Sequence, residues 1–77
     1  MAKQNLIIQE ELKKVGIKLR KLRIEKGYSK SETFAFTHNI SRAQYGRYEQ
    51  GQDLRLSSLL RVLNALEVTP EDFFKED

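Results

Sequence analysis

Residues 29–51 have the sequence SKSETFAFTHNISRAQYGRYEQG, which contains the signals of two short helices joined by a turn. Its first four residues match a capping box, in which the Ser29 hydroxyl accepts a hydrogen bond from the backbone N–H of Glu32 and the Glu32 carboxylate reaches back. The pattern predicts a short helix over about residues 30–38, with Phe34 facing inward.

A second helix is predicted over about residues 42–50. Ser41 is a favoured N-cap residue, and Gly51 tolerates the left-handed conformation that is common just past a helix end. Tyr45 and Tyr48 are three residues apart, so they share one face of this helix and are expected to lie in the core.

A tight turn over residues 38–41 would join the two helices. Asn39 accepts a left-handed backbone, and Ile40 would anchor the turn in the core. Ala35 is small where the helices would cross, which lets the two backbones approach at the angle of a helix-turn-helix. Taken alone, the stretch also fits an ordinary helical hairpin.

Upstream, a long helix is predicted over about residues 9–26, with Gly27 at its end. Residues 1–8 are expected to form a flexible N-terminal arm before a single domain of residues 9–77. Four apolar residues of the helix are spaced by three or four and would line one face: Leu12, Val15, Leu19 and Leu22.

Downstream, residues 56–66 carry leucines at helical spacing, which predicts a fourth helix. Thr69 is a favoured N-cap residue and Pro70 suits the first position of a helix, so a fifth, very short helix is predicted next. Phe73 and Phe74 would add apolar cover. The expected fold is therefore all-α, a compact bundle of five helices.

The composition is that of a small chain with an uneven charge distribution. It has 77 residues, no cysteine, and 14 Lys and Arg against 11 Asp and Glu, which suits one domain without disulfides. Residues 1–26 carry a formal charge of +5 and residues 56–77 a charge of −3. These charges can simply solvate helix faces, but a polyanion would prefer the basic end. The longest early apolar run, residues 6–8, is too short for a signal peptide or a membrane span, so a soluble, cytoplasmic protein is expected.

Taken in order, these motifs resemble the lambda-repressor-like, or XRE-type, helix-turn-helix family across residues 16–74. The resemblance implies the five-helix fold, sequence-specific binding to duplex DNA and, commonly, a dimer. It is carried by a series of short matches: residues 16–23 (GIKLRKLR), 25–29 (EKGYS), Ala35, 40–42 (ISR), 48–51 (YEQG), Leu59–Leu60 and 66–74 (LEVTPEDFF). The chain departs from the family pattern with Lys30 in place of glutamine, His38 in place of an aliphatic residue, Asn39 in place of glycine, and no proline before the fourth helix.

Four residues on the outer face of the third helix are the candidates for reading bases. An arginine can bind guanine through O6 and N7, and a glutamine can bind adenine through N6 and N7. Alanine can contact a thymine methyl group. The alternative for the arginines is that they are solvated surface residues. The base-reading candidates are Arg42, Ala43, Gln44 and Arg47, whose face is opposite Tyr45 and Tyr48.

The resemblance also assigns residues to the DNA backbone and to the architecture. Positions that hold phosphates in the family correspond to residues at helix ends and in the following loop, and helix N-termini help because they attract anions. The phosphate candidates are Lys30, Ser41, Gln50, Gln52 and Arg55. Arg23 and Glu49 match a pair that forms a structural salt bridge in the family, which would tie the first helix to the third.

Two aromatic residues of the second helix have no assigned role. His38 is expected to be partly buried in an aliphatic slot, with a pH switch as the alternative. Phe36 is expected to pack on the basic first helix, with a partner contact as the alternative.

No catalytic set, metal cluster or phosphate-cradling glycine loop is visible, so neither an enzyme nor a cofactor is expected. We expect a homodimeric transcriptional regulator, a repressor or autoregulator. Its two reading helices would enter successive major grooves of a near-palindromic site, about 34 Å apart. It would act in the cytoplasm, and at the nucleoid when bound to DNA.

The alternative is an antitoxin-like module that binds a protein partner such as a toxin, and DNA only secondarily. The acidic tail of residues 71–77, with Phe73 and Phe74, is the feature that would serve it. The resemblance puts the dimer surface on the fourth and fifth helices, with Leu54, Val62 and Phe74 as the candidate apolar contacts.

Overall fold

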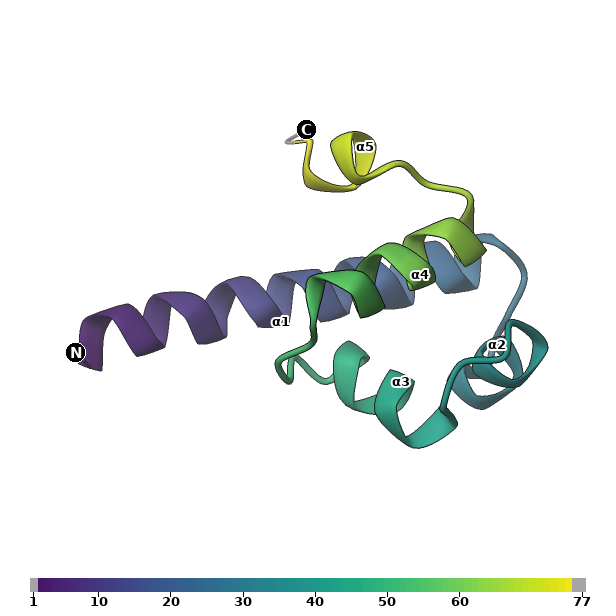
Figure 1. Ribbon diagram of the computed structural model, residues 1–77, viewed down its shortest axis with the longest axis horizontal. Helices are drawn as coiled ribbons and strands as arrows, with labels where there is room; N and C mark the ends of the chain where they lie inside the picture. The colour runs from purple at the N-terminus through teal and green to yellow at the C-terminus, as the bar shows by residue number, and fades with distance from the viewer. Residues whose placement is uncertain (1, 76–77) are drawn as a thin grey trace.

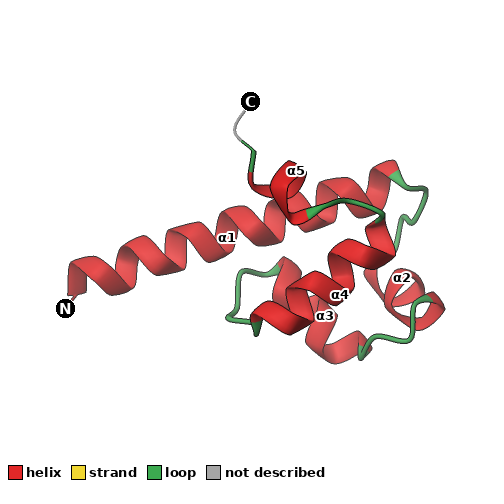
Figure 2. Ribbon diagram, turned by 45° about the horizontal axis from the view of Figure 1, so that its top comes forward, coloured by secondary structure: helices red, strands yellow, loops and turns green. Residues whose placement is uncertain are grey.

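The computed structural model describes residues 2–75, and its regular structure there consists of helices, without a strand (Figures 1 and 2). The predicted all-α, five-helix architecture is confirmed. Even the longest described helix has too many charged residues to cross a membrane, and the shorter ones do not qualify either. In chain order the helices are α1 (Ala2–Glu25), α2 (Ser31–Thr37), α3 (Arg42–Glu49), α4 (Leu56–Leu66) and α5 (Pro70–Phe74).

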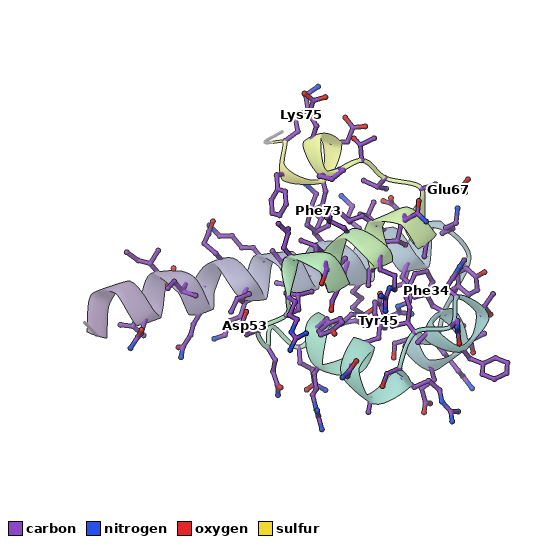
Figure 3. The ribbon with its side chains drawn as sticks, in the orientation of Figure 1. Phe34, Tyr45, Asp53, Glu67, Phe73 and Lys75 are labelled. Carbon is purple, nitrogen blue, oxygen red and sulfur yellow. The ribbon has the colours of Figure 1, made fainter. Side chains whose placement is uncertain are left out.

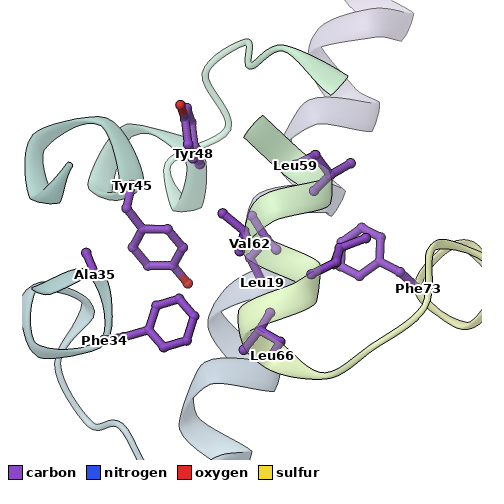
Figure 4. Packing of buried hydrophobic residues seen from close by; sticks show 10 residues of the cluster. Leu19, Phe34, Ala35, Tyr45, Tyr48, Leu59, Val62, Leu66 and Phe73 are labelled. Atoms are coloured by element: carbon purple, nitrogen blue, oxygen red, sulfur yellow. The ribbon is translucent and has the colours of Figure 1, made fainter. Parts of the chain in front are cut away.

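The core lies where the helices meet around α1 and α4, with α5 on the other side of these two helices from α2 and α3 (Figures 1 and 2). In Figure 4, Tyr45 of α3 faces Phe34 of α2, and Val62 of α4 lies beside Leu19 of α1. The Phe34 and Tyr45 ring centroids are 5.0 Å apart. The expected inward positions of both tyrosines of α3 are confirmed. The buried apolar residues are Leu19, Phe34, Ala35, Tyr45, Tyr48, Leu59, Val62, Leu63, Leu66 and Phe73.

Helix α1 begins at Ala2 rather than near Gln9, so the prediction that residues 1–8 stand outside the helix is wrong for residues 2–8; Met1 lies outside the described residues. The cause is local: residues 2–15 contain neither glycine nor proline and are rich in good helix formers. The first turns project beyond the other helices (Figure 1), and more than half of the surface of Leu6, Ile7 and Ile8 is exposed. The domain boundary at residue 9 stays a prediction.

Helix α2 begins one residue later than predicted. Lys30 is its N-cap residue and has an extended backbone, with φ −118° and ψ 134°. Ser29 therefore lies before the cap, where its hydroxyl cannot serve the first turn. The Ser29–Glu32 capping box is wrong, and no side chain caps this helix.

The other helix ends follow local signals. The Ser41 hydroxyl accepts a hydrogen bond from the Gln44 backbone N–H at 3.4 Å, and the Thr69 hydroxyl accepts one from Asp72 at 3.1 Å. Asn39 in the turn between α2 and α3 has φ 58°, which confirms the expected left-handed turn. Gly27 and Gly51 also have positive φ, at 107° and 91°.

Candidate nucleic-acid interface

Helix α3 has one flank in the core and the other in solvent. Tyr45 and Tyr48 are buried, which fixes the rotation of the helix about its axis. Because an α-helix has 3.6 residues per turn, Ala43 and Arg47 are turned away from these tyrosines, and Arg42 and Gln44 flank them on either side. Accordingly Arg42, Ala43, Gln44 and Arg47 are all exposed. All four candidate base readers therefore belong to the exposed surface of α3, which is its open flank.

A buried ion pair fixes the C-terminal end of α3 to α1. Arg23 Nε donates to Glu49 Oε2 at 2.7 Å and Arg23 Nη2 donates to Glu49 Oε1 at 3.0 Å, so the pair is bidentate. Arg23 Nη1 also donates to the backbone carbonyl of Tyr28 at 2.8 Å. The hydrogen bond to Glu49 raises the pKa of Arg23. The two side chains are only 5% and 9% exposed, so this is an architectural pair rather than a surface available to a ligand.

Gly16 lets α1 pass directly over the end of α3. A Cβ atom at this position would lie 2.5 Å from the Glu49 carbonyl oxygen and 2.7 Å from that of Tyr48. Such distances are not tolerated, so any side chain at position 16 would push the two helices apart. The sequence analysis included Gly16 only as part of the match over residues 16–23. The packing of α1 on α3 explains why a glycine is required there.

A hollow of about 540 Å³ lies between α3 and α4. Figure 3 labels Asp53 in the loop that joins these helices, and Asp53 belongs to the lining of the hollow. Four of the predicted DNA-contacting residues line it together, two from α3 and two from the loop: Gln44, Arg47, Gln52 and Arg55. The lining also includes Arg61 of α4, which the sequence did not single out. No local motif identifies Arg61, because only the packing of α4 beside α3 brings it to this surface.

The remaining predicted contact residues lie outside the hollow. Lys30 is exposed at the start of α2, and Gln50 is exposed at the end of α3. The Ser41 oxygen is used as the cap of α3, although its O–H can still donate to a phosphate. The structure therefore groups these residues around α3 without bringing them into a single cluster.

The structure defines the surroundings of His38 and Phe36. His38 is partly buried as expected, and two aromatic rings lie beside it: its ring centroid is 4.8 Å from that of Phe34 and 5.7 Å from that of Tyr28. Its Nε2 atom is buried without a hydrogen-bond partner. Phe36 is 75% exposed, so the expected packing on α1 is wrong. Phe34 and Ala35 already occupy the inward face of α2.

Within residues 2–75, no group of His, Cys, Asp or Glu side chains is arranged to hold a metal ion. The chemistry of this surface is instead that of guanidinium, amide and hydroxyl groups. These are the groups that bind phosphates and the edges of bases.

Comparison with known proteins assigns the chain to a class. A family model described as helix-turn-helix matches residues 19–73, so the chain belongs to this family. It is a DNA-binding transcriptional regulator, and the resemblance seen in the sequence is confirmed.

A solved structure extends the comparison. The chain is similar to the restriction-modification controller protein C.AhdI from Aeromonas hydrophila, with a TM-score of 0.75 and 36% sequence identity, over 86% of this chain and 96% of that one. No match was found among curated proteins. The two positive matches favour the regulator over the antitoxin-like alternative.

Proposed function

We propose that this regulator inserts α3 into the major groove of DNA and reads bases with Arg42, Ala43, Gln44 and Arg47. The observation that carries the proposal is the orientation of α3, in which all four side chains are exposed while Tyr45 and Tyr48 are buried in the core. An arginine pair to guanine and a glutamine pair to adenine would each discriminate by about 1–3 kcal/mol.

The backbone of the DNA would be held on both sides of the reading helix. Lys30 at the start of α2 and Ser41 at the start of α3 would contact phosphates on one side, and Gln50, Gln52 and Arg55 on the other. Such contacts fix register and orientation and contribute no sequence preference of their own.

The regulator would act as a homodimer on a near-palindromic site. Val62 is 1% exposed, so it belongs to the core and cannot form the dimer surface expected of it. On α4, Leu56 and Leu60 are 67% and 41% exposed, and on α5 Phe74 is 56% exposed. We assign the dimer surface to these three side chains, whereas the half-buried Leu54 lines the hollow between α3 and α4.

The solved relative suggests which genes are regulated. Because that protein is named a restriction-modification controller and nearly its whole length matches, we propose that this chain represses or autoregulates the transcription of restriction-modification genes. It would do so in the cytoplasm, at the nucleoid when bound to DNA, without a cofactor or catalytic activity of its own.

Selection of bound sequences from a random duplex pool at two salt concentrations tests this proposal. We expect one enriched motif made of two inverted half-sites about 10 base pairs apart from centre to centre. Its preference over unrelated duplexes should persist at the higher salt, where nonspecific phosphate attraction weakens steeply. A pool without an enriched motif would contradict base reading by α3.

A further inference from the structure

Three arginines from separate parts of the chain line the hollow between α3 and α4. Arg47 comes from α3, Arg55 is the N-cap residue of α4, and Arg61 lies within α4. Asp53 is the one carboxylate in the lining, so the hollow has a positive formal charge. It therefore favours an anion.

The groups in the lining suit a phosphate. Arginine presents a planar fork of N–H donors that matches two phosphate oxygens, and the Ser57 and Ser58 hydroxyls of the same lining can add single hydrogen bonds. The hollow adjoins the reading flank, because Gln44 and Arg47 belong to both. A DNA strand beside α3 would therefore pass its opening.

Arg61 is placed to hold a different point of that strand from Arg55. Arg55 is the N-cap residue of α4 and Arg61 follows it by six positions, which is about 9 Å along the helix axis at 1.5 Å per residue. Arg61 thus extends the line of cations from the loop along α4.

We infer that Arg61 is a further DNA-contact residue, which binds a backbone phosphate at the hollow and is opposed there by Asp53. This inference rests on the proposed docking of α3 in the major groove. The Arg61 contact would add affinity for DNA of any sequence, and the Asp53 carboxylate would weaken DNA binding.

The test measures the affinity of the intact protein for its selected site and for a scrambled duplex over a range of salt concentrations. We expect Arg61→Gln to weaken binding to both duplexes by about tenfold at low salt and to reduce the slope of log K against log salt by about 0.9. Arg61→Lys should keep the slope, because it keeps the charge. Asp53→Asn should strengthen binding to both duplexes.

The matched control is Lys21→Gln, which removes one positive charge from the groove between α1 and α5, on the other side of the molecule. It should leave the slope unchanged.

Other outcomes are also decisive. An unchanged slope for Arg61→Gln overturns the phosphate contact, and a loss confined to the selected site would make Arg61 a base reader instead. If circular dichroism shows that Arg61→Gln is unfolded, the affinities of Arg61→Lys and Asp53→Asn test the inference instead. An Asp53→Asn protein that binds DNA no more tightly than the wild type overturns it. Failure of the proposed function would look different, because the wild type itself would not distinguish the two duplexes.

Discussion

The Arg23 guanidinium is almost entirely buried, and the Glu49 carboxylate compensates its charge. Taking two charges out of water costs several kcal/mol each, and only a geometry with satisfied hydrogen bonds offsets this. Both nitrogens of the fork that face Glu49 are hydrogen-bonded, and the third donates to the Tyr28 carbonyl. Removing one partner would therefore leave a buried charge without compensation.

We expect Arg23→Met to lower the free energy of unfolding by about 3–5 kcal/mol, measured by urea denaturation. The double variant with Glu49→Leu should recover most of this loss, because neither charge is then left buried. The control is Glu11→Gln, which breaks a pair with Lys14 whose side chains are 63% and 74% exposed; it should change stability by less than about 1 kcal/mol. A loss with Arg23→Met as small as that of the control would contradict the architectural role.

Tyr45 has a buried hydroxyl without a hydrogen bond of normal geometry. Burial, and then the neighbouring Glu49 carboxylate, raise the pKa of Tyr45 above its ordinary value of 10.0. The folded protein keeps this phenol neutral, whereas the unfolded chain releases its proton near pH 10. The stabilising contribution is therefore fully present below pH 10 and is lost as the pH rises above it.

We expect the difference in unfolding free energy between the wild type and Tyr45→Phe to be constant below about pH 10. Above that pH it should move against the wild type by up to about 1.4 kcal/mol per pH unit. All other tyrosines and lysines are common to the two proteins, so the difference isolates Tyr45. If the unfolding free energies of the two proteins stay parallel through pH 11, Tyr45 ionises as easily in the folded protein as in the unfolded chain, which would contradict this prediction.

Single residues were predictable from the sequence where periodicity decides them. The spacing of Tyr45 and Tyr48 predicted their burial, and the resemblance to a family paired Arg23 with Glu49. The surroundings of Phe36 and His38 could not be predicted, because they depend on which helices pack against α2. Local sequence does not contain that information.

At the scale of helices, local chemistry predicts most ends. Thr69, Ser41 and Asn39 act as their side chains and backbone preferences indicate. The predicted capping role of Ser29 was wrong because Lys30 has an extended backbone, so α2 begins one residue later. The predicted start of α1 near Gln9 was wrong because residues 2–8 contain good helix formers and neither glycine nor proline, so the helix begins at Ala2.

Alanine substitution is expected to change stability in opposite directions at two helical glycines. A Cβ at Gly16 would overlap the backbone at the end of α3, whereas nothing lies within 4 Å of one at Gly46. We expect Gly16→Ala to destabilise the protein by about 1–3 kcal/mol, and Gly46→Ala to stabilise it by about 0.5–1 kcal/mol. Thermal or urea unfolding of the two variants checks this. Equal effects of the same sign would contradict the close contact between α1 and α3.

At the scale of the molecule, the hollow between α3 and α4 could not be predicted from the sequence. Gln44, Arg47, Gln52 and Arg55 were found by position in a motif, but their convergence with Arg61 requires the packing of two helices. The same limit applies to α4, where the leucine stripe is wider than the core. Only the packing separates the buried Val62 from the exposed Leu60.

The exposed leucines of α4 make a prediction about assembly. Leu60→Glu should give a monomer in sedimentation velocity without unfolding the chain, because Leu60 is 41% exposed. The variant should also bind a two-half-site duplex more weakly than the wild type. Ile24→Glu is the matched control, since Ile24 is 48% exposed on α1 and should leave the dimer intact. A Leu60→Glu protein that stays dimeric at the same concentration would contradict the assigned surface.

Base reading by the open flank of α3 is tested by the ratio of affinities for the selected site and a scrambled duplex at one fixed salt concentration. Replacing Arg42 and Arg47 together by alanine removes two base contacts, each expected to contribute about 1–3 kcal/mol of discrimination. We predict that the ratio falls by at least about 30-fold, with a smaller loss on the scrambled duplex. A ratio equal to that of the wild type, in a variant shown to be folded, would mean that another surface reads the DNA.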